Sequence, residues 1–274
     1  GKPKMAKQTG GGAEQPRTSP SSSSSSPIGL LVVATALVAA AIVYPLDSKV
    51  VVGDFEPEEY AGKDAGRAAE DHYFISNGVR CHAWLYLPEE KGTAKTKKSE
   101  DQDGKPPPPV VVMAHGFGAQ KDFGLERYAS VFVDRGLAVF MFDYRTFGAS
   151  EGTPRNNVAP NMHVEDWNAA IDHVASGGLN GKVDPKRIGL WGTSFAGGHV
   201  LTVGSMRRND TRIAGIVSQV PHLSGKRASL NGVKQRGVLG TLRLAAAALT
   251  DAARSLVGLS PVSVQIIGTR KDVA

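Results

Sequence analysis

The chain has 274 residues, 41% of them hydrophobic, which is enough to bury the core of one large domain or two small ones. Its single cysteine, Cys81, excludes an intramolecular disulfide and the zinc sites built from two or four cysteines. The formal net charge of +6 includes nine Lys and Arg against two Asp in residues 207–254, where no aromatic residue is interleaved. This pattern favours a solvated basic surface over a nucleic-acid site.

The N-terminal region divides into a polar tail and an apolar segment. Residues 1–27 are rich in Gly, Pro and Ser, so we expect disorder. Residues 28–44 carry no charge, and at about 1.5 Å per residue they just reach across a bilayer core of roughly 30 Å. We predict a single membrane anchor with a cytosolic N-terminus, because the basic flank precedes it. The alternative is a cleaved signal peptide ending near Ala39–Ala41, which would make the protein secreted or organelle-targeted.

The segment after the anchor reads as a β-hairpin followed by an insertion. Two β-rich runs, His72–Ser76 and Arg80–Leu87, are joined by Asn77-Gly78, a pair that tolerates positive φ. Cys81 lies in the apolar part of the second run, so we expect its thiol to be buried. Residues 88–109 are charged and contain four consecutive prolines, which indicates a solvated insertion without a site.

From Val110 onward, short apolar runs alternate with helical patterns. Apolar runs of this length suit strands buried on both faces, and the alternation predicts right-handed βαβ crossovers. The fold class is therefore α/β, with a mostly parallel, doubly wound sheet in a domain spanning 45–274. We expect strands at 110–114, 137–144, 187–191 and 213–220, and helices at 124–136, 163–178 and 195–206. The Ala/Leu-rich region 224–260 is interpreted equally well as a helical cap over the active site or as a packing helix.

Two serines compete for the role of a nucleophile. Ser150, in GASEG, matches the G-x-S-x-G signature of serine hydrolases, whereas Ser194, in GTSFA, misses its last position. A nucleophile elbow needs a strand directly before the serine, a helix directly after it, and small residues two positions to either side. Ser194 meets all of these requirements. Ser150 is followed by Pro154, which opposes an immediate helix, so we assign Ser150 to a turn.

The segments VVVMAHGFGAQKDF, FMFDYRTFGASEGTPRN and RIGLWGTSFAGGHVL together resemble the α/β-hydrolase superfamily, in particular the branch of dienelactone-hydrolase-like and Xaa-Pro dipeptidyl-peptidase-like proteins. The similarity runs from about His72 to Val220. It implies that Ser194 is the acyl-forming nucleophile, with the backbone N–H groups of Phe117 and Phe195 as its oxyanion hole. His115 would shape the loop that carries Phe117 and its oxyanion-hole N–H, rather than act as the general base. Neither a cofactor nor a metal ion is expected.

The chain departs from the family pattern in its acid and base. Downstream of Ser194 the histidines are His199, on the far side of the expected helix, and His222, which comes too early for the catalytic base. A strand that ends in Gly-x-x-Asp often supplies the acid of the triad. Asp272 follows Gly268 by four residues rather than three, so we do not assign it as the acid. We therefore expect the catalytic histidine to lie outside this chain, which would be C-terminally truncated and inactive alone.

The sequence thus predicts a serine hydrolase that cleaves an ester or related acyl bond of a small molecule, carboxylesterase-like rather than a peptidase. A thioesterase or peptidase of the same fold remains an alternative. A non-catalytic relative that binds ligands is the alternative from another class.

Overall fold

The computed structural model describes residues 68–89 and 106–264. The chain separates into two units, Gly1–Leu46 and Asp47–Ala274, and every described residue belongs to the second. The predicted disordered tail and membrane anchor lie outside the described residues. So do Asp272 and residues 90–105 of the charged insertion.

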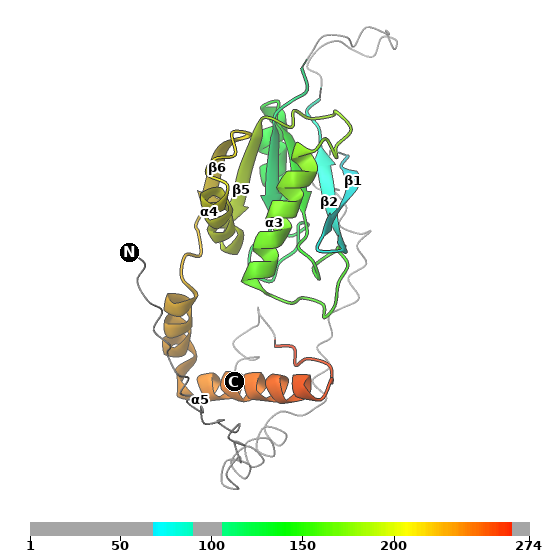
Figure 1. Ribbon diagram of the computed structural model, residues 1–274. Helices are drawn as coiled ribbons and strands as arrows, with labels where there is room; N and C mark the ends of the chain where they lie inside the picture. Colours follow the sequence, from blue (N-terminus) through cyan, green and yellow to red (C-terminus); the bar gives the residue numbers. More distant parts are fainter. Residues whose placement is uncertain (1–67, 90–105, 265–274) are drawn as a thin grey trace, which may run out of the picture. The chain divides into compact units, whose positions relative to one another are not determined.

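A six-stranded sheet forms the centre of the second unit, with the strand order β1-β2-β4-β3-β5-β6 (Figure 1). Neighbours are parallel from β4 through β3 and β5 to β6, whereas β2 is antiparallel to both β1 and β4. The expected α/β fold with an N-terminal antiparallel hairpin is therefore confirmed. The strands are β1 Glu70–Ser76, β2 Val79–Tyr86, β3 Val110–Ala114, β4 Ala138–Phe142, β5 Ile188–Thr193 and β6 Ile213–Gln219.

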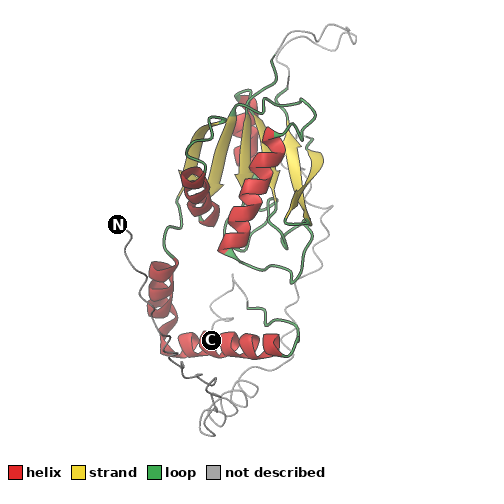
Figure 2. Cartoon of the chain, in the orientation of Figure 1, coloured by secondary structure: helices red, strands yellow, loops and turns green. Residues whose placement is uncertain are grey.

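Helices cover both faces of this sheet (Figure 2). They are α2 Glu126–Asp134, α3 Pro160–Ala175 and α4 Phe195–Met206. Alternate residues of β3 divide between the two layers, as a pleated strand requires. Val112 packs in one buried cluster with Trp167 of α3 and Val200 of α4, whereas Met113 packs in a second cluster with Ala129 of α2. The sheet is thus doubly wound, as predicted.

The hairpin brings the only cysteine into the core. Asn77 and Gly78 form its turn with φ of 45° and 77°. Cys81 of β2 is fully buried, and burial raises the pKa of its thiol to about 12. The expectation of a buried thiol is confirmed.

The helical region predicted at 224–260 forms α5, Gly225–Leu256. The hydroxyl of Ser224 caps it by accepting a hydrogen bond from the N–H of Arg227, and Gly237 interrupts it with φ 70° and ψ −176°. Whether α5 is a cap over the active site stays a prediction. Of the helices that the structure describes, none is long and apolar enough to cross a membrane.

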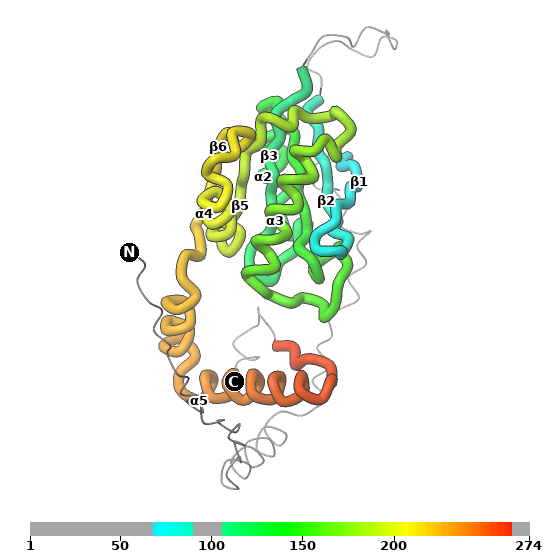
Figure 3. Tube along the Cα trace, viewed as in Figure 1, coloured from blue at the N-terminus to red at the C-terminus, as the bar shows by residue number. Residues whose placement is uncertain are grey.

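The strand directions decide where a site can form. The chain runs from the hairpin through β3, β4 and β5 to β6, and Figure 3 labels β3, β5 and β6 along this path. Because β3, β4 and β5 are parallel, the segments that follow them, beginning at His115, Asp143 and Ser194, emerge at one edge of the sheet. Ligands of open α/β sheets bind at this edge.

Candidate active site

Ser194 occupies a one-residue turn between a strand and a helix. β5 ends at Thr193 and α4 begins at Phe195. Ser194 itself has φ 54° and ψ −113°, a conformation that costs free energy for an L-residue. Its N–H donates to the carbonyl of Gln219 at 3.0 Å, and its carbonyl accepts from the N–H of His222 at 2.8 Å. These bonds hold the strained residue in place and leave Ser194 exposed.

The strand and helix that flank Ser194 nearly touch. A Cβ added to Gly192 would lie 2.3 Å from the carbonyl oxygen of Ala196, and a Cβ on Gly198 would lie 2.2 Å from that of His222. Both distances are far below van der Waals contact. Ala196 is fully buried, so its methyl group is accommodated on the core side. The predicted need for small residues two positions before and after Ser194 is met in this geometry.

The loop after β3 passes beside the side chain of Ser194. A Cβ on Gly116 would lie 3.3 Å from Cβ of Ser194 and 3.7 Å from its Oγ. Among the described residues, no backbone hydrogen bond uses the N–H of Phe117 or of Phe195. The rings of these two residues pack edge to face with centroids 5.3 Å apart, and Phe117 is 48% exposed. The surroundings of Ser194 therefore combine backbone amides with an apolar surface.

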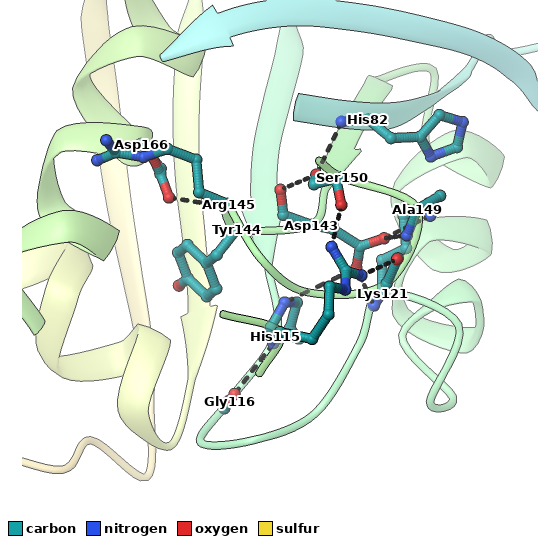
Figure 4. Close-up of polar contacts among 12 residues, drawn as sticks. His82, His115, Gly116, Lys121, Asp143, Tyr144, Arg145, Ala149, Ser150 and Asp166 are labelled. Atoms are coloured by element: carbon teal, nitrogen blue, oxygen red, sulfur yellow. Dashed lines mark hydrogen bonds and ion pairs between the residues drawn. The ribbon is translucent and has the colours of Figure 1, made fainter. Parts of the chain in front are cut away.

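Ser150 is used structurally. Its hydroxyl donates to the carbonyl of Asp143 and accepts from the N–H of His82, both at 2.8 Å (Figure 4). Ser150 is 3% exposed, and the turn around it includes Gly148 with φ 48°. Its hydroxyl thus joins the end of β4 to β2 and is not presented to solvent.

All seven histidines lie in the described parts of the chain, and none hydrogen-bonds to Oγ of Ser194. Nδ1 of His115 donates to the carbonyl of Gly116 at 3.0 Å, and burial lowers the pKa of this ring. His199 packs edge to face on Phe195 rather than toward the hydroxyl, with ring centroids 4.5 Å apart. His222 contacts Ser194 through its backbone.

A buried ion pair lies beneath the loop that carries Phe117. Lys121 Nζ donates to the Asp143 carboxylate at 2.7 Å, and these residues are 4% and 0% exposed. Sequence reasoning missed this pair, because Lys121 stands in a polar stretch that reads as surface. A signal that could have found Asp143 is its place within the apolar run 137–144, which was expected to be a buried strand. In the part of the chain that the structure describes, no three His, Cys, Asp or Glu side chains are placed to hold a metal ion.

The steric account of the elbow predicts unequal effects at two glycines of β5. Gly192→Ala forces its new methyl group into the backbone of α4, and we expect a loss of several kcal/mol of unfolding free energy or failure to fold. Gly189→Ala is the matched control, because its Cβ would lie 3.6 Å from a methyl group of Val111, an ordinary contact. Urea denaturation of both variants measures the difference. Equal stability of the two would contradict the close approach at Gly192.

The buried histidines predict acid sensitivity. His163 stacks on Tyr144 with ring centroids 4.1 Å apart, and burial lowers the pKa of His163 to about 3 and that of His199 to about 4. An unfolded histidine has a pKa near 6.5, so the unfolded chain binds protons first as the pH falls. The stabilisation is complete above pH 6.5 and is lost progressively toward pH 4. From pH 7 to pH 5 we expect a loss of at most about 2 kcal/mol per histidine.

The variant His163→Phe tests whether the loss of stability in acid comes from this histidine, because a phenyl ring can keep the stacking on Tyr144 but cannot take a proton. Urea denaturation at pH 7 and pH 5 should show a smaller pH effect in the variant than in the wild type. An unchanged pH effect would show that His163 does not contribute to the pH dependence of the unfolding free energy.

Comparisons with known proteins show the family of the chain. The sequence pattern of the family described as serine aminopeptidase, S33 (Hydrolase_4), matches residues 105–258. The quorum-quenching protein AidA of Acinetobacter baumannii is 38% identical over 200 residues, which are 73% of this chain and 58% of AidA. The thiohydrolase aneE of Aspergillus aculeatus is 32% identical over 153 residues, 56% of this chain and 41% of that protein. The chain thus spans about half the length of these two relatives.

Solved structures show the same fold. The hypothetical protein PA2218 from Pseudomonas aeruginosa has a TM-score of 0.56 at 24% identity, over 76% of this chain and 61% of that one. The α/β hydrolase GrgF from Penicillium sp. has a TM-score of 0.52 at 23% identity, over 73% of this chain and 59% of that one. The expected superfamily is confirmed, while the dienelactone-hydrolase-like branch stays a prediction. With more than half of its length matched by the family pattern, the chain belongs to the serine aminopeptidase S33 family of α/β-hydrolases.

Proposed function

We propose that the protein is a serine hydrolase that cleaves an ester or related acyl bond through an acyl-enzyme on Ser194. The observation that carries this proposal is the exposed Ser194 at φ 54° and ψ −113° between β5 and α4, directly beside Gly116. A strained strand-to-helix turn of this kind presents a serine hydroxyl at the top of an α/β-hydrolase sheet. Membership in the family supports the same chemistry.

The proposed reaction proceeds in two halves. Oγ of Ser194 attacks the acyl carbon, and the electron pair of the carbonyl moves onto its oxygen. The N–H groups of Phe117 and Phe195 donate to that oxyanion, a contribution of about 2.7–4 kcal/mol each in comparable enzymes. The bond to the leaving alcohol then breaks, and the alcohol takes up a proton. Water attacks the acyl-enzyme in the second half and releases the carboxylic acid and Ser194.

The serine proton needs a general base, and none of the described histidines is hydrogen-bonded to Oγ of Ser194 in the role of that base. His163 and His199 are buried with lowered pKa values. A neutral serine is a poor nucleophile without an oriented base. The chain alone should therefore hydrolyse esters slowly or not at all.

The surroundings of Ser194 favour an esterase over an aminopeptidase. An aminopeptidase must bind a free α-ammonium group, for which an exposed carboxylate is the natural partner. The side chains that contact one another beside Ser194 are instead aromatic, Phe117, Phe195 and His222. A thioester is the second candidate substrate, because one relative is named a thiohydrolase, aneE. A panel of p-nitrophenyl esters, acyl thioesters and aminoacyl anilides separates these classes.

A fluorophosphonate probe tests the nucleophile in the full-length protein. Wild type should be labelled, because attack of Oγ on phosphorus expels fluoride and leaves a stable adduct. Ser194→Ala should abolish labelling. Ser150→Ala is the matched control and should keep labelling per folded molecule, although its lost buried hydrogen bonds cost about 1–3 kcal/mol. Labelling that persists in Ser194→Ala, or that never occurs in wild type, contradicts the proposal.

We further propose that residues 28–44 anchor the protein in a membrane as a single pass, with a cytosolic N-terminus. The uncharged segment and its basic N-terminal flank support this. After extraction of membranes with alkaline carbonate, the protein should stay in the pellet, and a variant lacking residues 28–44 should be released. Release of the wild-type protein would contradict the anchor, and an N-terminus of the released protein near Ala39–Ala41 would favour the alternative of a cleaved signal peptide.

A further inference from the structure

We propose that the buried Lys121–Asp143 pair is a positioning device for the oxyanion hole, holding the loop from His115 to Lys121 in register with Ser194. The inference rests on the proposed function, because it concerns how the N–H of Phe117 is aimed. It assigns a role in catalysis to two residues that contact neither the nucleophile nor the acyl group.

The Asp143 carboxylate joins two loops at the same edge of the sheet (Figure 4). Its Oδ1 accepts from the backbone N–H of Lys121 at 2.8 Å and lies 3.7 Å from Nε2 of His115. Its Oδ2 accepts from Lys121 Nζ at 2.7 Å and from the backbone N–H of Ala149 at 3.1 Å. Asp143 directly follows the last residue of β4, so the carboxylate itself is held by the sheet.

This arrangement fixes both ends of the oxyanion loop. His115 begins the loop where β3 ends, and its Nδ1 donates to the carbonyl of Gly116. Lys121 ends it, bound to Asp143 through backbone and side chain. The ammonium group of Lys121 also lies 4.3 Å from the centroid of the Trp84 ring on β2. Phe117 lies between these two attachment points, so its N–H can shift little relative to Ser194.

Packing around the carboxylate is tight as well. A Cβ on Gly148 would lie 2.1 Å from Oδ2 of Asp143. Burial alone would raise the pKa of Asp143, but the Lys121 ammonium and the neighbouring His115 outweigh it and hold this pKa below its usual range. The carboxylate is therefore charged at neutral pH and remains an acceptor for every donor around it.

A purely stabilising role accounts poorly for this pair. A buried ion pair loses most of its Coulomb energy to desolvation, and an apolar pair of similar size often stabilises a fold as well. What an apolar pair cannot do is accept directional hydrogen bonds from two loops. Small displacements of an oxyanion donor lower the rate steeply, because the donor acts in the transition state.

The test compares two buried pairs in the full-length protein, with p-nitrophenyl butyrate as substrate. Lys121→Met/Asp143→Asn removes both charges and leaves no uncompensated ion. Arg145→Met/Asp166→Asn is the matched control, because Arg145 and Asp166 are 7% and 0% exposed and connect β4 to α3 rather than to the oxyanion loop. Rates are divided by the folded fraction, measured by near-UV circular dichroism.

The positioning role predicts that kcat of Lys121→Met/Asp143→Asn falls at least about 10-fold while KM changes less than about 2-fold. The control pair should lose stability with kcat and KM nearly unchanged. An unchanged kcat in the folded Lys121 and Asp143 variant overturns the proposal, as does an equal fall in the control. If that variant does not fold, Lys121→Gln is measured in its place, and the same fall in kcat at nearly constant KM is expected. Wild type that neither turns over ester nor reacts with fluorophosphonate refutes the proposed function instead.

Discussion

The close approach of β5 and α4 at Ser194 is the constraint on which the site depends. At Gly192 there is no room for even one methyl group against the backbone of Ala196, and this contact makes the turn sharp enough to expose a single residue. Ser194 adopts an unfavourable backbone conformation there, which hydrogen bonds to Gln219, the last residue of β6, and to His222 in the following loop help to maintain. The parallel sheet then brings the loops after β3 and β4 to the same edge.

Two buried carboxylates, those of Asp143 and Asp166, connect the segments that meet near that edge. Asp143 connects the loop beside Ser194 to the loop that contains Ser150. Asp166 accepts from the side chain of Arg145 and from the hydroxyl of Ser76, and so joins α3 to β4 and β1. Buried charges are costly unless they are paired and hydrogen-bonded, and both carboxylates meet that condition. Of these two networks, the one around Asp143 reaches the loop beside Ser194, whereas the one around Asp166 holds α3 against the hairpin side of the sheet.

Local signals in the sequence were sufficient for most of the elements and for placing Ser194 between a strand and a helix and Ser150 in a turn. Short apolar runs marked β3, β4 and β5, and Gly192 and Pro154 separated the elbow from the turn because their effects act over a few residues. Contacts between distant residues left no such pattern. Lys121 and Asp143 are 22 residues apart, and nothing in the polar stretch around Lys121 indicates burial against Trp84. The stacking of His163 on Tyr144 and the bend of α5 at Gly237 likewise depend on tertiary structure.

The proposed mechanism requires that Ser194, and not Ser150, attacks the substrate. The most direct measurement is mass spectrometry of tryptic peptides after reaction of the full-length protein with a fluorophosphonate. The two serines fall in separate peptides, 188–207 and 146–155. If Ser194 is the nucleophile, a phosphonyl adduct forms on peptide 188–207, with fragment ions that place it at Ser194. An adduct on peptide 146–155, or on a serine other than Ser194, would contradict this mechanism.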